Sequence, residues 1–289
     1  MKGFAHILRT QELLGPHTWF KLGGPAEYFG EPTRADELLG LVQRCHEIGA
    51  PVRILGGGSN LLVREAGVPG LVLHLSASEF SQIRVDGQVV TAGGGAMLGH
   101  VISTAVREGL GGLEQLVGIP GTVGGALRGN AAWAGTDVGQ WVRRATVMTR
   151  AGEVITHERD SMRFSYRHSS LDELVILSAE FELEPESVDE LTKRLQKTWI
   201  VKKANVPPSN ENAGCIFKDV GGASAASLIE AAGLHASTVG RAEVSRHNAN
   251  FLVARPGATS RELLDLIELL KHGVSDRCGV DLELALEVW

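Results

Sequence analysis

Residues 118–130 constrain what this chain can form more than any other stretch. They read Gly-Ile-Pro-Gly-Thr-Val-Gly-Gly-Ala-Leu-Arg-Gly-Asn, with glycine at five of thirteen positions and one proline. Glycine adopts positive φ angles readily and lets the backbone approach a bound molecule closely. The stretch therefore predicts a loop in contact with a ligand, not an ordinary helix or strand.

The polar groups of this loop indicate the kind of ligand. Thr122 and Asn130 are its only uncharged polar side chains, and Arg128 is its only charge. The remaining hydrogen-bonding capacity is a row of backbone N–H groups, which suits phosphate and other anions. For this loop alone, a tight glycine turn without a ligand is an equally good interpretation.

Two further glycine stretches favour a ligand. Residues 56–60 read Gly-Gly-Gly-Ser-Asn after the apolar run 51–55, and residues 93–95 are three glycines after the strand-like run 89–92. None fits the Rossmann pattern G-x-G-x-x-G, and none is followed by the Lys-Ser/Thr of a P-loop. A dinucleotide is compatible with these stretches, but by neither of those two routes.

Length and charge limit the partners. The 289 residues exceed the usual single-domain core, so two or three domains or lobes are expected. Hydrophobic residues make up 43% and charged residues 21%, as in ordinary globular proteins. The net charge of -6 argues against a nucleic-acid partner, because binding a phosphate backbone needs a basic surface. A small-molecule ligand is expected.

The cysteines and the N-terminal residues predict a cytoplasmic location. Cys45, Cys215 and Cys278 are widely separated, with no C-x-x-C and no histidine cluster at zinc-like spacing, so thiols and no metal site are expected. Residues 1–14 carry charges and lack a continuous apolar core, unlike a secretory signal. No run approaches the ~20 apolar residues of a membrane helix, so no membrane partner is expected.

Hydrophobic periodicity and turn signals predict the elements. Helices are expected over 34–48, 97–109, 188–203, 224–232 and 259–272. Strands are expected over 51–55, 71–75, 82–92 with a turn at 86–87, 144–157 with a turn at 151–152, 174–183, 250–254 and at the C-terminal end.

A domain boundary is expected near residues 185–187, where a capping box opens a helix. That helix is expected to carry Leu191, Leu195 and Trp199 inward. Residues 164–170 are polar and aromatic without periodicity, so a loop is expected there.

Five motifs together resemble one family, UDP-N-acetylenolpyruvoylglucosamine reductase, the bacterial MurB flavoenzyme. They are Thr-Trp-Phe-Lys-Leu-Gly-Gly-Pro-Ala (18–26), Gly-Gly-Gly-Ser-Asn-Leu-Leu (56–62), Gly-Ile-Pro-Gly-Thr-Val-Gly-Gly-Ala (118–126), Tyr-Arg-His-Ser (166–169) and Gly-Cys-Ile-Phe-Lys (214–218). They occur in the family's order and span nearly the whole chain.

The resemblance implies an α+β fold. Its parts would be a two-lobed FAD-binding domain of p-cresol methylhydroxylase type and a C-terminal α+β substrate-binding domain. The implied ranges are an N-terminal segment 1–17, an FAD-binding domain 18–185 with lobes at about 18–75 and 76–185, and a substrate domain 186–289.

The implied reaction is the NADPH-linked, FAD-dependent reduction of UDP-N-acetylglucosamine enolpyruvate to UDP-N-acetylmuramate. The cofactors would be FAD and NADPH, and the enzyme is expected to be a monomer. The implied FAD-binding residues are Gly56, Gly57, Gly58, Ser59, Asn60, Gly118, Ile119, Pro120, Gly121, Thr122, Gly124 and Gly125.

Two catalytic positions follow from the resemblance. Arg167 would polarise the enolpyruvyl carboxylate, a task that suits a planar bidentate donor, with Tyr166 beside it as a substrate contact. Cys215 stands where the family commonly has serine and would donate the proton, and a thiol is a better acid than a hydroxyl. Without the resemblance, Arg167 is better explained as a surface residue and Cys215 as a buried small hydrophobe.

The third catalytic position has three candidates. The family pattern Gly-Val-x-Leu-Glu-x-Glu-Val, aligned without a gap, puts Ala285 where the catalytic glutamate belongs. Allowing two extra residues selects Glu287, which we choose over Glu283. In a strand all three positions would share one face, about 7 Å apart between neighbours. Solvent-facing carboxylates without a role are nearly as good an interpretation.

Lys203 and Lys218 would contact the diphosphate or uridine of the substrate, as the resemblance implies. Nearby Gln-Pro and Asn-Pro dipeptides of the family are replaced here by Val206-Pro207 and Asp219-Val220. Cations at a helix end or in a loop are usually just solvated, which is the alternative for both lysines.

Three other functions stay open from the residues. The chain could be a flavin-dependent oxidase or dehydrogenase for another substrate, or a catalytically impaired homologue that binds nucleotide. A hydrolase using Cys215 and His247 has only composition in its favour.

Overall fold

The computed structural model describes residues 3–208 and 213–289. The chain folds into two compact units, each discontinuous in sequence. The first unit comprises residues 1–11, 27–57 and 69–200, and the second comprises residues 12–26, 58–68 and 201–289. The continuous ranges expected from the sequence therefore do not coincide with these units, because two short N-terminal segments group with the C-terminal residues.

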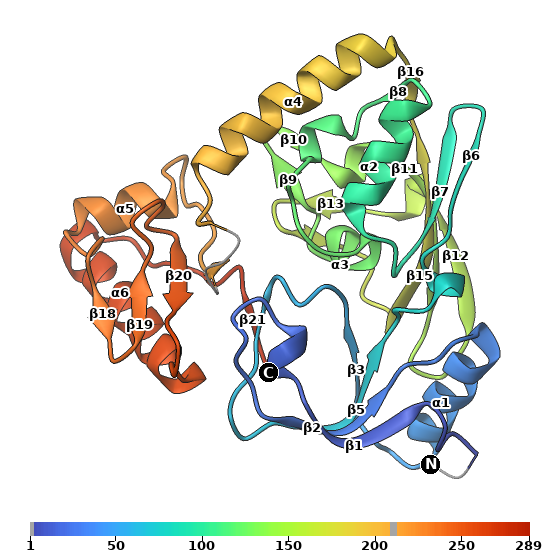
Figure 1. Ribbon diagram of the computed structural model, residues 1–289, viewed down its shortest axis with the longest axis horizontal. Coiled ribbons are helices and arrows are strands. Elements are labelled where there is room, and N and C mark those ends of the chain that lie inside the picture. The colour runs from blue at the N-terminus through green and yellow to red at the C-terminus, as the bar shows by residue number, and fades with distance from the viewer. Residues whose placement is uncertain (1–2, 209–212) are drawn as a thin grey trace. The chain divides into compact units, whose positions relative to one another are not determined.

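A four-stranded sheet in the order β1-β2-β5-β3 contains most of the N-terminal strands (Figure 1). Its strands are β1 (Leu8–Leu13), β2 (Pro25–Gly30), β3 (Val52–Leu55) and β5 (Val68–His74), with β3 and β5 parallel. Helix α1 (Ala35–Glu47) forms as expected. Acidic residues in its first turn and basic residues in its last suit the helix dipole.

A five-stranded antiparallel sheet in the order β12-β11-β15-β7-β6 forms the centre of the first unit. Its strands are β6 (Ile83–Asp86), β7 (Val89–Gly93), β11 (Val142–Met148), β12 (Val154–Glu158) and β15 (Val175–Glu182). The turns expected at 86–87 and 151–152 are present, with φ of +58° at Gly87 and +88° at Gly152. Helices α2 (Leu98–Arg107) and α3 (Val123–Arg128) cover one face of this sheet (Figure 1).

Short strand pairs complete the first unit. They are β8 (Leu110–Gly111) with β16 (Glu184–Pro185), β9 (Ala132–Trp133) with β10 (Thr136–Asp137), and β13 (Phe164–Ser165) with β14 (His168–Ser169). The last pair shows that the loop expected over 164–170 is wrong, because these residues form a hairpin. Backbone pairing of Phe164 with Ser169 and of Ser165 with His168 forms a hairpin that side-chain periodicity could not reveal.

The glycine-rich stretch also differs from expectation, because its second half is helical. Thr122 caps α3 by accepting a hydrogen bond from the N–H of Gly125. The helix is six residues long and buries Val123, Ala126 and Leu127 in the sheet's core. Burial of these three side chains outweighs the low helix propensity of the adjacent glycines.

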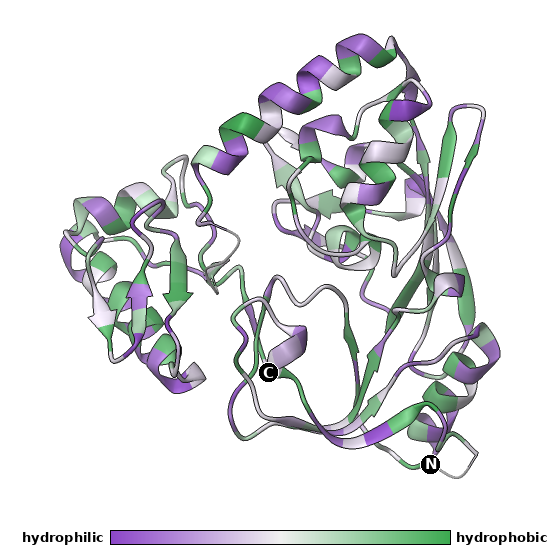
Figure 2. Ribbon diagram, in the orientation of Figure 1, coloured by the Kyte–Doolittle hydropathy of each residue, from purple (hydrophilic) through white to green (hydrophobic). Residues whose placement is uncertain are grey.

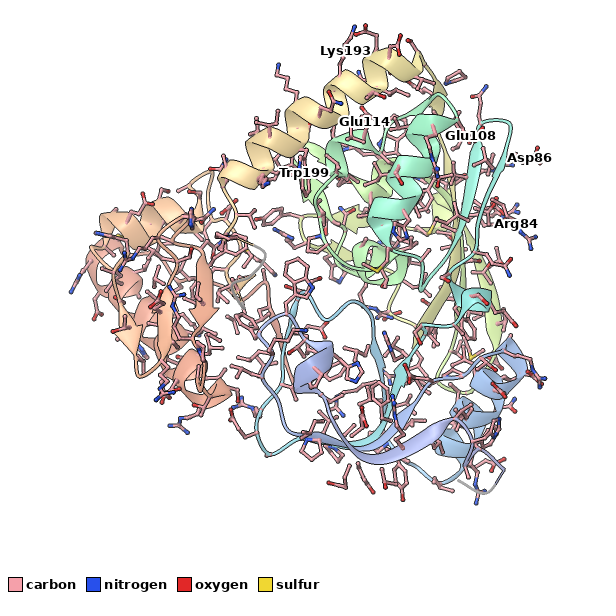
Figure 3. All side chains as sticks on the ribbon, viewed as in Figure 1. Arg84, Asp86, Glu108, Glu114, Lys193 and Trp199 are labelled. Atoms are coloured by element: carbon pink, nitrogen blue, oxygen red, sulfur yellow. The ribbon has the colours of Figure 1, made fainter. Side chains whose placement is uncertain are left out.

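Helix α4 (Val188–Ala204) begins where the sequence predicted. Figure 2 shows hydrophilic colour over its first turns and a hydrophobic band near its C-terminal end. Leu191 is buried and Leu195 partly so, but Trp199, labelled in Figure 3, is 46% exposed. The expectation that Trp199 points inward is therefore wrong, and the two units divide within this helix, between residues 200 and 201.

The second unit contains a sheet in the order β17-β20-β19-β18. Its strands are β17 (Ala213–Cys215), β18 (Thr238–Val239), β19 (Ala242–Val244) and β20 (Phe251–Ala254). Helices α5 (Ala225–Ala231) and α6 (Ser260–Cys278) pack on it. The helix predicted to end at residue 272 continues to Cys278, because Gly279 in the left-handed conformation is its C-cap.

The C-terminal residues do not form the long strand that was expected. Only β21 (Glu287–Val288) is a strand, paired in parallel with β4 (Leu61–Leu62). Before it, a single bridge joins Leu284 to Phe217. The alternation of faces assumed for residues 283, 285 and 287 therefore does not hold.

Glu65 links segment 58–68 to the start of α6. Its carboxylate accepts hydrogen bonds from the backbone N–H of Ser260 and from the Ser260 hydroxyl, the latter at 2.5 Å. Burial works to raise the pKa of Glu65, but these hydrogen bonds outweigh it and hold the pKa below its ordinary value. The charged form is therefore the one that the folded state stabilises.

Glu65→Gln is expected to lower the free energy of unfolding by about 1 kcal/mol at pH 7, discounted for solvent screening. In the native protein this contribution is complete above the unfolded pKa of glutamate and is lost as pH falls through the lower folded pKa. Urea unfolding at pH 7 and pH 3 measures it, with Glu268→Gln on the exposed face of α6 as the control. An equal acid sensitivity in wild type and Glu65→Gln would contradict this role.

Candidate functional site

In the first unit, two of the three glycine stretches lie against each other. A Cβ on Gly57 would lie 2.9 Å from the Cα of Gly121, and one on Gly56 would lie 2.8 Å from the Thr122 Oγ1. Only glycine permits this approach of backbone to backbone. The two turns, far apart in sequence, therefore lie directly against each other.

The third glycine stretch serves packing instead. Cβ atoms on Gly93, Gly94 and Gly95 would lie 2.1, 1.8 and 2.1 Å from the backbone oxygens of Phe80, Ile176 and Leu75. Close contact with the protein's own backbone therefore explains these glycines without a ligand.

The row of open N–H groups expected over 118–130 is shorter than the sequence suggested. The N–H of Val123 donates to the carbonyl of Ala96, and the N–H of Gly124 donates to that of Gly94, each at 2.8 Å. Gly118 and Gly121 keep the positive φ angles, +79° and +110°, of a glycine loop. The N–H groups of Val123 and Gly124 are therefore already used within the protein, and Gly118 and Pro120 are the exposed residues of the loop before α3.

The hairpin of β13 and β14 carries Tyr166 and Arg167 at its turn. The side chain of Tyr166 is 52% exposed and that of Arg167 is exposed. Arg167 has a φ of +57°, which is uncommon for a residue with a side chain. Both side chains are thus presented to solvent from a tight two-residue turn.

In the second unit, Cys215 ends β17 opposite Phe251 of β20. Asn250 holds the next two residues: its carbonyl accepts from the Ile216 N–H at 3.0 Å, its Oδ1 accepts from the Phe217 N–H, and its Nδ2 donates to the Phe217 carbonyl, the last two at 2.8 Å. The side chain of Cys215 is partly buried and is not in a disulfide. Asn250 thereby fixes the backbone immediately after the proposed proton donor.

The C-terminal segment passes beside this strand. Ala285 donates its N–H to the carbonyl of Ile216 at 2.8 Å, and its own carbonyl accepts from the Asn60 Nδ2 at 2.7 Å. The Glu287 N–H donates to the Asn60 carbonyl at 3.1 Å, while its carboxylate is exposed and accepts from the Trp289 indole at 3.4 Å. These hydrogen bonds bring together Asn60, Ile216 and Ala285. Glu287 follows Ala285 by two residues along the chain.

Lys218 and Glu283 form an ion pair at 3.3 Å, so the carboxylate of Glu283 already has a cation beside it. Lys203 is exposed on α4, whereas its neighbour Lys202 is 4% exposed. Burial lowers the pKa of Lys202 to about 7, so its charge varies near neutrality.

Gly58, Ser59 and Asn60 belong to the second unit. Gly58 has a φ of +62°, and a Cβ there would lie 2.0 Å from the carbonyl oxygen of His17. Its own carbonyl accepts from the Trp19 N–H at 3.0 Å. The glycine is therefore required by the fold of the segment 12–26 whether or not a cofactor contacts it.

The sequence marked Asn130 only as a polar group of the glycine-rich loop and left Asn250 without a role, yet both are buried polar residues with paired hydrogen bonds. Asparagine amid apolar or glycine-rich residues is the signal that could have found them, because a buried carboxamide needs both of its ends satisfied.

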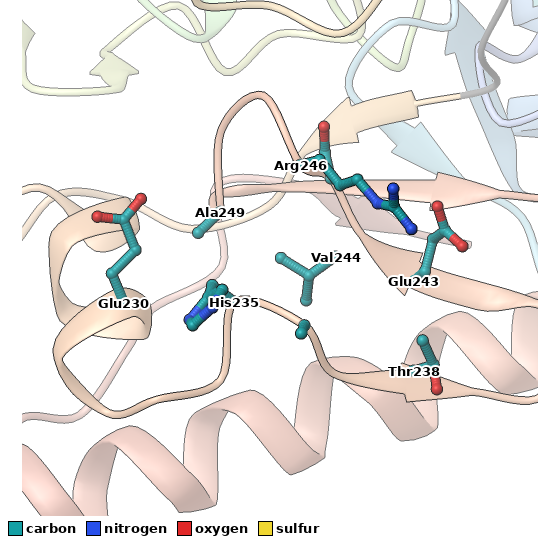
Figure 4. Close-up of a pocket in the computed structure, with 9 residues that line it drawn as sticks. Glu230, His235, Thr238, Glu243, Val244, Arg246 and Ala249 are labelled. Carbon is teal, nitrogen blue, oxygen red and sulfur yellow. The ribbon is translucent and has the colours of Figure 1, made fainter.

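A separate cavity of about 670 Å³ lies in the second unit, between α5, β18, β19 and the loop after β19 (Figure 4). Its charged lining consists of Glu230, His235, Glu243 and Arg246. None of the site residues expected from the sequence lines it. Across the described residues, no group of three or more His, Cys, Asp or Glu side chains could hold a metal ion. The described helices include none long and apolar enough to cross a membrane.

Comparisons with known proteins identify the class first. Residues 26–158 match the model of an FAD binding domain, and residues 206–289 match that of the C-terminal domain of UDP-N-acetylenolpyruvoylglucosamine reductase. The crystal structure of the MurB reductase from Thermus caldophilus superposes with a TM-score of 0.85 at 31% identity, covering 98% of this chain and 99% of that one. The expected fold class, a flavoprotein α+β fold with a C-terminal substrate domain, is confirmed.

Curated relatives define the family. A UDP-N-acetylenolpyruvoylglucosamine reductase from Rhodopirellula baltica is 38% identical over 284 residues, covering 98% of this chain and 93% of the relative. One from Symbiobacterium thermophilum is 40% identical over 284 residues, covering 98% and 92%. This chain belongs to the UDP-N-acetylenolpyruvoylglucosamine reductase family, as the sequence motifs indicated.

The close approach of Gly57 to Gly121 leads to a prediction. Gly57→Ala is expected to push the two glycine turns apart and to weaken FAD binding at least about tenfold, the effect of one or two lost contacts. Titration of the apoprotein with FAD, followed by flavin fluorescence, measures the dissociation constant. Gly99→Ala is the matched control, because its Cβ would meet nothing within 4 Å. Equal FAD affinity in both variants would contradict the expected role of this contact.

Proposed function

We propose that this protein reduces UDP-N-acetylglucosamine enolpyruvate to UDP-N-acetylmuramate, with FAD as cofactor and NADPH as reductant, in peptidoglycan precursor synthesis. The observation that carries the proposal is its near full-length membership of the reductase family, with the FAD-binding and C-terminal domain models matching separate parts of the chain. The expected reductase, an oxidoreductase of the flavin-dependent type, is the activity of that family.

The residues of the first unit fit a large cofactor held mainly by backbone. Two glycine turns lie in close contact, and Gly118 and Gly121 have the positive φ angles of a glycine loop. The hydroxyl of Thr122 adds a specific polar group. When bound, FAD reduced by NADPH supplies the hydride.

Arg167 binds and polarises the carboxylate of the enolpyruvyl group. A guanidinium donates two parallel hydrogen bonds to a carboxylate, and the attraction strengthens as negative charge builds up on the enolpyruvyl carbons during hydride transfer. Tyr166, next to it in the turn, is a substrate contact. The exposed position of both side chains leaves them accessible to substrate.

Cys215 donates the proton that completes the reduction. The hydride adds to one carbon of the alkene, and the thiol S–H protonates the adjacent carbon, leaving a thiolate that solvent reprotonates. A thiol with an ordinary pKa of about 8.5 is protonated at neutral pH, as a general acid must be.

Glu287 is our choice for the carboxylate that assists protonation. Glu283 is less suitable because Lys218 already pairs with it. A Glu287→Gln variant with full activity would assign the whole protonation step to Cys215.

Lys203 and Lys218 contact the diphosphate or uridine of the substrate, since both are cations of the second unit whose side chains are not buried. A monomer in the cytoplasm completes the proposal. The Cys/His hydrolase is not favoured by any observation, and the other two alternatives are outcomes of the test below.

The test is anaerobic turnover of the purified holoenzyme. Oxidation of NADPH that depends on UDP-N-acetylglucosamine enolpyruvate, with a product heavier by one hydride and one proton in mass spectrometry, is the expected result. NADPH oxidation without that substrate, or by another acceptor only, would favour a flavin oxidase or dehydrogenase. No oxidation by a protein that retains FAD would indicate an impaired homologue.

A further inference from the structure

The hairpin that carries Arg167 does not hold this side chain directly. Within residues 3–208 and 213–289 the guanidinium of Arg167 makes no hydrogen bond or ion pair. Its position is therefore set by the backbone of β13 and β14, and the hairpin contains only two residues in each strand. Such a short hairpin is not stable by itself.

Asn130 supplies one support from outside the hairpin. Its Nδ2 donates to the carbonyl of Ser165, the residue before the turn, at 2.9 Å, and its Oδ1 accepts from the Gly139 N–H at 3.1 Å. The side chain is 2% exposed, so both ends of the carboxamide are satisfied away from solvent. Its φ of +41° is one that asparagine tolerates better than most residues.

Ser169 supplies the second support. This serine, which closes the hairpin opposite Phe164, is buried and donates its hydroxyl to the carbonyl of Arg128 at 3.2 Å. The Arg128 guanidinium in turn donates to the carbonyl of Glu173, beyond the hairpin. Both strands are thus joined to the end of α3 by side-chain hydrogen bonds.

Gly139 adds a steric contact to the same arrangement. A Cβ on Gly139 would lie 2.3 Å from the ring of Phe164, the first residue of β13. The N–H that Asn130 accepts therefore belongs to a residue packed directly against the hairpin. A cavity of about 660 Å³, lined by Ser165, His168 and Ser170, also borders the hairpin. The contacts that hold the hairpin therefore come from the side of α3.

These contacts connect Arg167 with the glycine turns through a short path. Thr122, which touches Gly56, is the N-cap of α3, and Asn130 follows two residues after α3 ends. All of these residues belong to the first unit. A displacement of the glycine turns would be transmitted to the Arg167 hairpin through α3 and the carboxamide of Asn130.

We propose that Asn130 is a positioning residue, which fixes the Arg167 hairpin to the end of the glycine-rich segment and thereby holds Arg167 for the substrate carboxylate. Ser169 assists it through the Arg128 carbonyl. The inference rests on the proposed function, because it assigns the carboxylate of the enolpyruvyl substrate to Arg167.

Asn130→Asp tests the inference with little change of shape. The carboxylate still accepts from Gly139 but cannot donate to Ser165, so only the hairpin bond is lost. We expect KM for UDP-N-acetylglucosamine enolpyruvate to rise about tenfold, while flavin reduction by NADPH stays within about twofold. Lowering the pH protonates the introduced carboxyl, restores a donor and lowers KM toward the wild-type value.

A coupling experiment separates positioning from a general loss of stability. In an Arg167→Met background, Asn130→Asp is expected to cause no further fall in kcat/KM, because the side chain that it positions is gone. Val147→Ala, buried in the same core, is the control that lowers Tm without a change of KM. A fall in kcat/KM that is equal in both backgrounds would overturn the inference.

Hydrogen exchange of the amides in residues 164–169 needs no activity. Faster exchange in Asn130→Asp than in Val147→Ala supports the inference, and equal exchange overturns it. If the wild-type holoenzyme does not turn over the enolpyruvyl substrate, the proposed function fails, while this exchange result still decides whether Asn130 holds the hairpin.

Discussion

Arg167→Met is expected to lower kcat/KM for UDP-N-acetylglucosamine enolpyruvate about 10³-fold, the cost of about 4 kcal/mol for a lost charge-assisted bidentate contact with a carboxylate. Arg167→Lys should recover only part of this loss, because an ammonium cannot reproduce two parallel hydrogen bonds. Steady-state kinetics with varied substrate measure the change. Reduction of the flavin by NADPH should stay near the wild-type rate.

The matched control for Arg167 is Arg84 on β6, labelled in Figure 3. Its guanidinium is exposed and donates to Gln82 at 2.7 Å, so Arg84→Met removes the same charge at an unrelated surface. Its kcat/KM should equal that of the wild type. Similar losses in both variants would point to long-range electrostatics and contradict a direct contact through Arg167.

Cys215→Ala is expected to slow product formation about 10³-fold, within the range that general acid catalysis contributes. Cys215→Ser should retain activity within about tenfold, because the hydroxyl can still donate a proton although it is the weaker acid. Single-turnover reoxidation of the reduced flavin by substrate measures this step. Flavin reduction by NADPH is expected to be unaffected in both variants.

Cys278→Ala is the control for loss of a thiol, since Cys278 lies on α6 and its Sγ donates weakly to Leu228 at 3.8 Å. It should show wild-type turnover. If Cys215→Ala forms product within about threefold of the wild-type rate, water or another group donates the proton, and the role given to Cys215 is wrong.

The regular elements could be predicted because their signals are local. Leu38, Leu41, Val42 and Cys45 of α1 are all fully buried, as their helical spacing indicated. Gly87 and Gly152 mark the two hairpin turns because those turns need positive φ. The order of motifs was sufficient for the family, since each motif is specific in both composition and position.

The hairpin at 164–169 and the helix at 123–128 could not be predicted because neither has a local signal. Each is stabilised by residues distant in sequence, such as Asn130 for the hairpin and the sheet core for α3. In the glycine-rich stretches, a glycine that packs against the protein's own backbone cannot be told by sequence from one that belongs to a loop. Gly94 is packed against Ile176, whereas Gly121 belongs to the turn that meets Gly57.

The position of the final carboxylate was unpredictable for a related reason. A strand was assumed, and strand geometry would have put residues 283, 285 and 287 on one face. The path of this segment is instead fixed by a backbone hydrogen bond from Ala285 to Ile216 and by one from the Asn60 side chain to the Ala285 carbonyl. The Asn60–Ala285 contact joins parts of the chain 225 residues apart.

The most direct test of the proposed reduction uses the enzyme-bound flavin under anaerobic conditions. The holoenzyme is bleached with one equivalent of NADPH and then mixed with UDP-N-acetylglucosamine enolpyruvate, with UDP-N-acetylglucosamine as the control. We predict rapid return of the oxidised flavin spectrum with the first compound only, together with formation of UDP-N-acetylmuramate. A flavin that stays reduced after addition of the enolpyruvyl substrate would contradict the proposed function.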